Sequence, residues 1–294
     1  MQRTNIEYLT HTWSPIAMRC TPVSEGCLNC WHLRMADRMA ANPAFPDDVR
    51  AAYAGEGPPV LIEKRLEEPM RRRKPSVIGV QFMGDLWHEQ VPDEIRHDIF
   101  SVMAFCQQHT FVTLTKRARE MFDWFIHPAV RRRRWPMEGS LWAMQLGKTF
   151  ELPLPNVIGM VTAENQHCAD ERIGLLLGCP FVLRGVSVEP MLERLYVWDY
   201  LPKYDYRPMY AFYQAAFPEA GDQPILLQEG LDWVACGFET GPKARPGDFA
   251  WARSLRDECE EASTPFFWKR AAPGQETPED LMVREFPHMG KEES

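Results

Sequence analysis

The stretch VIGVQFMGDLWHEQVPDEIRHDIFSVMAFCQQHTFVTLT, residues 77–115, contains two short apolar runs separated by a helical pattern. The runs VIGVQF (77–82) and TFVTLT (110–115) are rich in β-branched and aromatic residues. They lack the regular polar alternation of a half-exposed strand, so we predict two strands that are buried on both faces. A strand, an amphipathic helix and a second strand in this order are typical of a parallel sheet with crossover helices.

The same alternation continues along the chain. Helical patterns separate further β-rich runs, which brings the number of expected strands to about seven. The additional runs are IEYLTHTW (6–13), NVIGMVT (156–162), FVLRGVSV (181–188), DWVACGF (232–238) and PFFW (265–268). We therefore predict an α/β fold, a partial or full (β/α) barrel with parallel strands. An open doubly wound sheet is the alternative, although no G-x-G-x-x-G loop follows any of these runs.

Composition and charge narrow the classes of protein that fit this chain. Of the 294 residues 45% are hydrophobic, and the formal net charge is −8. No run approaches the roughly 18 consecutive apolar residues of a membrane helix, and the N-terminus has no apolar signal core. We expect a cytoplasmic protein without a membrane partner, located in the host cytoplasm if it is phage-encoded.

The sequence also suggests where the domain ends and which segments leave it. We expect residues 1–270 to form the barrel domain, with an aromatic-rich insertion at 191–230 that either packs on the barrel or stacks on a flat substrate. Residues 271–294 are predicted to be an acidic, flexible tail, since residues 275–294 hold six acidic and two basic side chains. The basic runs at 71–74 and 131–134 are either solvated or in contact with nucleic-acid phosphates.

Polar residues follow each predicted strand. Because the carboxyl ends of parallel strands meet at one edge of a barrel, we expect these residues to form one polar pocket. They include Gly84 and Asp85 after the second strand, Lys116 and Arg117 after the third, Glu164 and Asn165 after the fourth, Glu189 after the fifth, Glu239 after the sixth and Lys269 after the seventh.

Three cysteines crowd the loop that follows the first strand, in CTPVSEGCLNCW (20–31). In a reducing compartment such a group indicates metal or cluster ligation rather than disulfides. One possibility is a structural zinc on Cys20, Cys27 and Cys30, with His32 as the fourth ligand. The other is an iron–sulfur cluster whose three thiolate ligands leave one iron open.

The position of this loop and the motifs around it resemble radical S-adenosylmethionine enzymes. The set WSPIAMRC, FMGDLWHEQ, HTFVTLTKR, NVIGMVTAENQ, RGVSVEP, DWVACGFETGPKARP and PFFWK resembles an uncharacterised, phage-associated, radical-SAM-like family with a C-x6-C-x2-C motif. The resemblance covers nearly the whole chain. The sequence departs from the family pattern at several positions, among them Ser14 for Asn and Trp31 for Tyr.

The resemblance implies a barrel of radical SAM type, a 4Fe-4S cluster and S-adenosyl-L-methionine as cofactors. It implies hydrogen abstraction by a 5'-deoxyadenosyl radical, after one electron from a donor such as flavodoxin or ferredoxin. Phage association points to isomerisation or carbon–carbon bond formation on a modified nucleobase during DNA hypermodification. A zinc-stabilised, non-catalytic nucleic-acid-binding module is the alternative.

The resemblance also implies roles for individual residues. Cys20, Cys27 and Cys30 would hold the metal. Trp31, Gly84, Asp85, Glu164, Asn165 and Glu189 would bind the cofactor, with Trp31 near adenine and Glu164 and Asn165 at the ribose. Lys116, Glu239 and Lys269 would be catalytic by holding an anionic substrate. The other role for these charged residues is an ion-pair ring around the mouth of the barrel.

Overall fold

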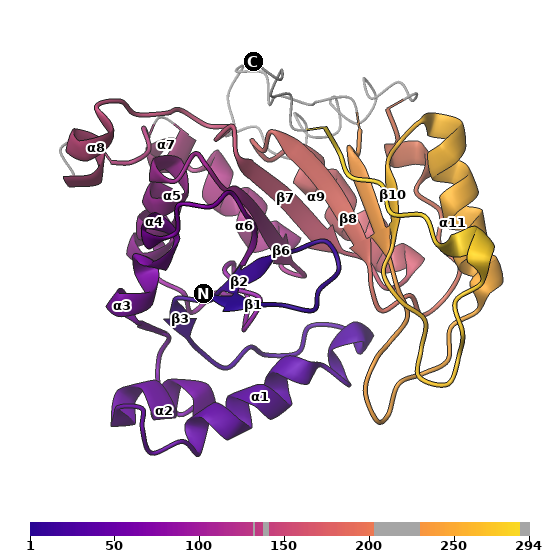
Figure 1. The fold of residues 1–294 in the computed structure, drawn as a ribbon, viewed down its shortest axis with the longest axis horizontal. Coiled ribbons are helices and arrows are strands. Elements are labelled where there is room, and N and C mark those ends of the chain that lie inside the picture. The colour runs from indigo at the N-terminus through magenta and orange to yellow at the C-terminus, as the bar shows by residue number, and fades with distance from the viewer. Residues whose placement is uncertain (132, 138–140, 203–229, 289–294) are drawn as a thin grey trace.

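The computed structural model describes residues 1–131, 133–137, 141–202 and 230–288 of the chain. It shows a mixed α/β fold built on one eight-stranded sheet with the order β1-β2-β5-β6-β7-β8-β9-β10 (Figure 1). All neighbouring strands from β2 to β10 are parallel, and β1 is antiparallel to β2. The α/β class and the largely parallel sheet predicted from the sequence are therefore confirmed.

The sheet follows the order of the chain without a reversal, unlike a doubly wound sheet. Among the described residues β2 and β10 do not pair, so the hydrogen-bonded sheet ends at β1 and β10. The strands are β1 (Gln2–Arg3), β2 (His11–Trp13), β5 (Val77–Val80), β6 (Thr110–Thr115), β7 (Val157–Thr162), β8 (Leu183–Val188), β9 (Trp233–Cys236) and β10 (Phe266–Trp268).

Helices between successive strands cover one face of the sheet. The main hydrophobic core contains Ile99 from α5, Phe122 from α6, Ile173 from α9 and Leu255 from α11, together with alternate strand residues such as Phe111. These helices are α5 (Asp93–Phe105), α6 (Ala118–Ile126), α9 (Gln166–Leu177) and α11 (Phe249–Ala262). Because consecutive parallel strands need a crossover connection, each helix returns the chain to the edge where the next strand begins.

The other face of the sheet has a smaller core, to which no helix contributes among the described residues. It contains Val112, Ile158 and Ala235 from the strands, and Tyr8 and Leu9 from the loop before β2. The predicted first strand, residues 6–13, is therefore a strand only at His11–Trp13, and its first residues form a cover for this second face.

The chain between β2 and β5 forms an annex at the carboxyl ends of the strands. The strands β3 (Ile16–Ala17) and β4 (Val60–Leu61) form a small antiparallel sheet. This sheet packs with α1 (Trp31–Ala40) and α2 (Asp47–Ala54) around a small core of its own. Figure 1 shows α1 and α2 together, apart from the helices that cover the sheet. The cysteine loop enters this annex between β3 and α1, with the 3-10 turn η1 (Glu25–Cys27) inside it.

The remaining helices are short. They are α3 (Glu63–Leu66) and α4 (Glu68–Arg71) before β5, α7 (Pro128–Arg131) and α8 (Leu141–Leu146) before β7, and the 3-10 turns η2 (Trp198–Tyr200) and η4 (Glu279–Leu281). Among the described residues, no helix combines the length and the apolar character needed to cross a membrane.

The segment predicted to be a flexible tail is bound to the fold as far as residue 288. The amide of Trp268 donates to the carbonyl of Val283 (2.8 Å), and the amide of Glu285 donates to that of Phe266 (3.0 Å). Asp280 pairs with Arg253 of α11 (2.7 Å). Its acidic composition suggested a solvated segment, but Asp280 has two arginine partners and Leu281 is fully buried. Residues 289–294 lie outside the described residues.

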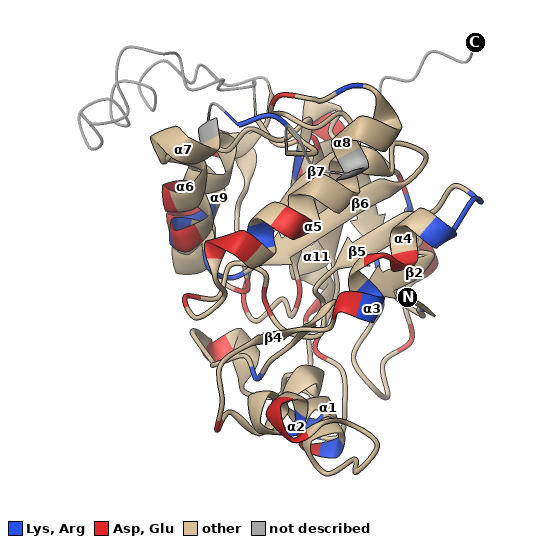
Figure 2. Cartoon of the chain, turned by 90° about the vertical axis from the view of Figure 1, so that its left-hand side faces the viewer, with Lys and Arg blue, Asp and Glu red and all other residues tan. Residues whose placement is uncertain are grey.

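The two basic runs lie at the amino-end edge of the sheet. Residues 71–74 directly precede β5. The described residues of the second run, Arg131, Arg133 and Arg134, come after α6 has returned from the carboxyl end of β6, and Arg132 lies outside the described residues. Figure 2 shows the basic stretch beside α4 well away from α1 and α2. Several of these side chains have partners: Arg71 pairs with Glu67 (2.6 Å) and Arg134 with Glu151 (3.2 Å).

Of the predicted aromatic insertion, residues 203–229 lie outside the described residues. In the described part, Leu195, Val197 and Leu201 are buried in the main core, whereas Tyr196 is half exposed. The beginning of the insertion thus packs into the main core beside α11. Most of its aromatic residues lie outside the described residues, so both roles given to them stay predictions.

Close packing between β7 and the segment before β8 gives a test of the fold. A Cβ atom at Gly159 would lie 2.1 Å from the nearest ring carbon of Phe181, which is buried. We expect Gly159→Ala to lower the free energy of unfolding by about 2 kcal/mol, because the buried ring has no free space to move into. Chemical denaturation measures this change. Phe181→Leu in the Gly159→Ala background should restore part of the loss, and a Gly159→Ala variant as stable as wild type would contradict the packing.

Candidate functional site

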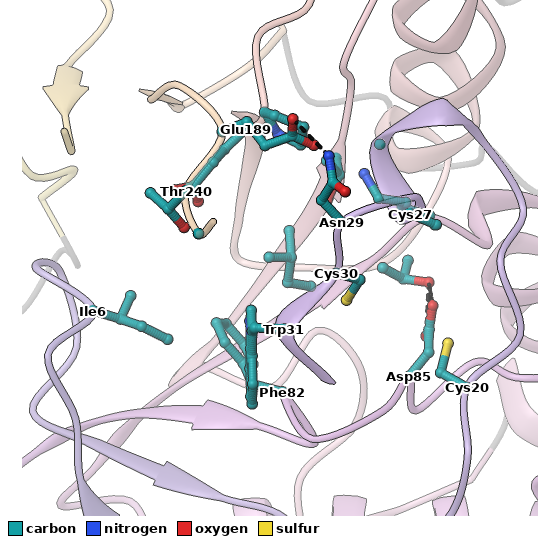
Figure 3. A pocket seen from close by; sticks show the side chains of 18 of the residues that line it. Ile6, Cys20, Cys27, Asn29, Cys30, Trp31, Phe82, Asp85, Glu189 and Thr240 are labelled. Atoms are coloured by element: carbon teal, nitrogen blue, oxygen red, sulfur yellow. Dashed lines mark hydrogen bonds between the residues drawn. The ribbon is translucent and has the colours of Figure 1, made fainter. Parts of the chain in front are cut away.

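A pocket of about 320 Å³ opens at the carboxyl-end edge of the sheet, between the strand ends and the annex. Figure 3 shows the thiols of Cys20 and Cys30 toward one side of it and Ile6 and Thr240 toward the other. Ten predicted site residues line the pocket: Cys20, Cys27, Cys30, Trp31, Gly84, Asp85, Lys116, Glu189, Glu239 and Lys269. Of the predicted set, Glu164 and Asn165 are not among its lining residues.

The charged residues of the site continue the alternation of the strands. Side chains on a strand alternate between the two faces, and Val112, Ile158 and Ala235 mark the face without helices. Lys116, Glu164 and Glu239 are each separated from one of these residues by an even number of positions, so the alternation assigns them to the same face. The same alternation leads from Leu183 to Glu189 and from Phe267 to Lys269. The alternation along each strand therefore indicates which polar residues at the strand ends belong to the site, whereas their polar character alone does not.

The three cysteines of the loop differ from all others in the chain. Cys20, Cys27 and Cys30 are partly exposed, whereas the other five cysteines are buried. Burial is the main reason that the pKa of the Cys20 thiol rises to about 12, with the Asp85 carboxylate adding to it. Within the described residues no three His, Cys, Asp or Glu side chains are gathered closely enough to hold a metal ion. The number, softness and shared pocket of the three thiols nevertheless fit a thiolate-ligated centre.

The first cysteine is fixed by two neighbouring side chains. Its amide donates to Nε2 of His32 (3.0 Å), and Nη1 of Arg117 donates to its Sγ (3.5 Å). Arg117 also donates to the hydroxyl of Thr21 (2.6 Å). Burial, helped by Arg19, lowers the pKa of His32 to about 4, so the ring is neutral near pH 7. Since Nε2 already accepts a hydrogen bond and Nδ1 is buried, His32 is poorly placed to be a fourth zinc ligand.

The middle of the cysteine loop lies directly on a buried ion pair. Glu164 Oε2 accepts from Lys116 Nζ (3.0 Å) and from Arg172 Nη1 (2.9 Å), and its side chain is fully buried. A Cβ atom on Gly26 would lie 3.1 Å from both Glu164 Cδ and Lys116 Nζ. Burial raises the pKa of Glu164, but Lys116 and Arg172 outweigh it and lower the pKa to about 2. Glu164 thus supports the loop from below instead of facing the pocket.

The last part of the loop is held by residues that follow β9. We call the group of Glu239, Arg245 and Asn29 the clasp. Arg245 donates through Nε to Glu239 Oε2 (2.9 Å) and through Nη2 to Oε1 (2.7 Å). Asn29, between the second and third cysteines, donates to Glu239 Oε2 (3.1 Å). Arg245 also reaches the carbonyl of Glu25 (3.1 Å). This clasp connects the cysteine loop to a segment more than 200 residues away in the sequence.

Three further predicted residues have structural partners. Asp85 accepts hydrogen bonds from the hydroxyl of Thr115 (2.8 Å) and the amide of Trp87 (3.0 Å), which fastens the end of β5 to that of β6. Gly84 has φ of 136°, and a Cβ there would meet Met18 at 2.8 Å, so only glycine fits. Asn165 caps α9 by accepting from the amide of Cys168 (2.9 Å).

Glu189 and Lys269 form an ion pair on the wall of the pocket, between the ends of β8 and β10. The ammonium of Lys269 lies 4.9 Å from the centre of the Tyr8 ring. Burial lowers the pKa of Lys269, but the charge of Glu189 more than compensates, so the net direction is upward and the amine stays charged. Tyr8, which the sequence interpretation did not single out, lies on the face of the sheet opposite the helices, because its ring packs against Trp233 and Phe267.

The sequence interpretation also missed Asn29 of the clasp and Arg172, the partner of Glu164, since neither carries a motif of its own. Their presence could have been inferred from Glu164 and Glu239, which follow the strands on the face opposite the helices. A buried carboxylate requires a cationic or amide partner. The chain thus has a mixed α/β fold with a cysteine-lined pocket at the carboxyl ends of its parallel strands.

The chain belongs to the family described as "Protein of unknown function (DUF5131)", whose family model matches residues 3–290. No curated protein and no solved structure matches the chain.

The clasp predicts the reactivity of the thiols. We expect Glu239→Gln to raise the alkylation rates of Cys27 and Cys30 in the metal-free protein about tenfold, because losing about 1.4 kcal/mol of charge-assisted hydrogen bonding lets the loop open more often. Mass spectrometry after timed alkylation measures the rates. Asp280→Asn, which breaks an exposed pair with Arg253, is the charge-matched control. Equal rates in all three proteins would show that Glu239 does not hold the loop.

The lowered pKa of Glu164 predicts a pH dependence of stability. A folded-state pKa of about 2, below the ordinary glutamate value, means that the ionised form stabilises the fold at neutral pH and that this contribution disappears as the pH falls toward 2. We expect Glu164→Gln to cost about 3 kcal/mol at pH 7 and less at about pH 3. Denaturant unfolding of both proteins over this range tests the expectation. Glu67→Gln, which breaks an exposed pair with Arg71, should cost under about 0.5 kcal/mol at either pH.

Proposed function

We propose that this chain is a radical S-adenosylmethionine enzyme in which Cys20, Cys27 and Cys30 hold a 4Fe-4S cluster. The observation that carries the proposal is that the three cysteines of the chain that are not buried all line one pocket. Three thiolates can ligate three irons and leave the fourth for a small-molecule ligand. A zinc-stabilised binding module has less support, because His32 is already engaged with the Cys20 amide.

The fold is compatible with the barrel of this enzyme class. Seven strands in sequence order, with helices on one face and a loop cover on the other, support a partial (β/α) barrel. In such barrels the chemistry takes place at the carboxyl ends of the strands, where this pocket lies. We propose a cytoplasmic enzyme that receives electrons from a donor such as flavodoxin or ferredoxin.

When bound, the cluster and S-adenosyl-L-methionine supply a 5'-deoxyadenosyl radical that abstracts a hydrogen atom from substrate. The residues of the chain position and shield these groups. Arg117 orients the Cys20 thiol, Glu164 supports the middle of the loop at Gly26, and Glu239 holds its last part at Asn29. We propose that Trp31, which is 45% exposed on the pocket wall, packs on adenine.

We further propose that the substrate is a modified nucleobase that the enzyme isomerises or otherwise remodels. The aromatic side chains of the pocket support a flat substrate. The two basic runs do not support a polynucleotide held at the pocket mouth, since they lie at the opposite edge of the sheet. A nucleic-acid partner, if bound, has to approach from the carboxyl-end edge.

Cluster content tests the proposal. We expect anaerobically reconstituted protein to contain about four irons per chain and to cleave S-adenosylmethionine, because three thiolates suffice for the cluster. Cys20→Ala, Cys27→Ala and Cys30→Ala should each abolish both properties, as measured by iron analysis and by release of 5'-deoxyadenosine. Cys106→Ala and Cys259→Ala are the matched controls, since both thiols are buried in the helical core. Stoichiometric zinc without iron after reconstitution would sink the proposal.

A further inference from the structure

The pocket has a second part, away from Cys20, which we call the Glu189–Lys269 subsite and define as Ile6, Tyr8, Phe82, Glu189 and Lys269. We propose that this subsite binds a flat, neutral heterocycle through a lactam or imide edge, in which a ring carbonyl lies next to a ring N–H. The inference rests on the proposed function, because it names the substrate class of the same pocket.

The charges of the pocket wall favour a neutral ligand. Apart from the exposed Arg34, which has no ion pair among the described residues, the acids and bases that line the pocket are joined in pairs. These pairs are Lys116 with Glu164, Arg117 with Glu89 and Asp85, Glu239 with Arg245, Arg270 with Glu7, and Lys269 with Glu189. An anionic ligand beside Lys269 would face the carboxylate of Glu189, and a cationic one beside Glu189 would face the ammonium. Either arrangement places like charges together in a partly desolvated site, which is costly.

The Glu189–Lys269 pair presents a donor and an acceptor side by side. An ammonium has three N–H donors, and that of Lys269 donates to Glu189 and lies beside the Tyr8 ring. The side chain of Lys269 is 6% exposed and that of Glu189 is 24% exposed, so both retain some access to the pocket. A ligand carbonyl can accept from Lys269 while the adjacent N–H donates to Glu189. A lactam edge satisfies both groups without separating the pair.

The surrounding side chains match the flat part of such a ligand. Ile6, Phe82 and Leu114 are partly buried hydrophobic residues that pack against the second core and line the pocket. The Tyr8 ring supports the ammonium from its other side at 4.9 Å, and Tyr8 is itself held edge-on by Trp233. A heterocycle on this wall would bury its faces on apolar atoms and turn its polar edge to the ion pair.

Calorimetric titration of the full chain with thymidine, N3-methylthymidine and adenosine tests the inference. Thymidine carries the imide edge, the N3-methyl group removes its N–H donor, and adenosine has no ring lactam. We expect thymidine to bind and N3-methylthymidine to bind at least about tenfold more weakly, because methylation leaves the Glu189 carboxylate without its partner. Adenosine should also bind more weakly than thymidine. Equal affinity for thymidine and its N3-methyl derivative, or undetectable binding of thymidine at millimolar concentration, would overturn the inference.

Substitutions separate the subsite from the rest of the pocket. Glu189→Gln should weaken thymidine about tenfold and erase the difference from N3-methylthymidine, since the amide presents a donor where the carboxylate accepted. Glu193→Gln is the matched control: this exposed glutamate is four residues further along and accepts from the amide of Gln166 outside the pocket. Unchanged thymidine binding in Glu189→Gln would contradict the assigned contact. A parallel titration with single-stranded oligothymidylate distinguishes a free nucleoside from a base within a polymer, and N3–H-dependent binding of either one supports the subsite.

Iron analysis on the same samples distinguishes the two proposals. N3–H-dependent thymidine binding in protein that never takes up iron would support the subsite and remove the radical chemistry. Protein that holds about four irons and cleaves S-adenosylmethionine but does not discriminate between the two thymidines would support the chemistry and overturn the subsite.

Discussion

The common direction of seven strands is the constraint on which the rest of this structure depends. Parallel strands place all their carboxyl ends at one edge, and their inward-pointing side chains meet there above a small core. Acids and bases that are far apart in the sequence are thereby brought together in one partly desolvated region. Such charges are tolerated only in pairs, so the edge becomes a set of ion pairs. The cysteine loop rests on these pairs and takes its position from them.

Each end of the cysteine loop has its own set of partners, which makes the loop part of the sheet edge instead of a free connection. Arg117 from the end of β6 fixes its start, Glu164 from the end of β7 lies under Gly26, and Glu239 from the end of β9 holds Asn29. The roles that the resemblance suggested for Glu164 and Asn165 at a ribose therefore remain untested, while their structural roles as a buried support and a helix cap are visible. The charged residues at the strand ends form ion pairs, as expected for the second of their two predicted roles, an ion-pair ring.

Much of the fold could be predicted from local sequence, and most of the site could not. Continuous apolar runs such as TFVTLT correspond closely to β6, because a strand buried on both faces leaves a pattern that needs no knowledge of its neighbours. The pairing of Glu239 with Asn29 leaves no such pattern, since it depends on where a loop 210 residues away returns. The acidic segment at the end of the chain is a related case. Its composition predicts exposure to solvent, yet Asp280 forms ion pairs with Arg253 and Arg256 of α11. Composition describes a segment alone, whereas burial depends on its partner.

The contact between the two ends of the chain has a consequence for biosynthesis. Arg270 pairs with Glu7, and Lys269 lies over the ring of Tyr8, so the floor of the pocket joins residues 263 positions apart. A ribosome releases the N-terminal segment long before β10, and until β10 emerges the contacts of Glu7 with Arg270 and of Tyr8 with Lys269 cannot form. The pocket wall formed by Lys269 and Arg270 is therefore missing throughout elongation and is completed only at its end. Any group destined for this pocket thus has a natural period for insertion, between release of the loop and arrival of the last strand.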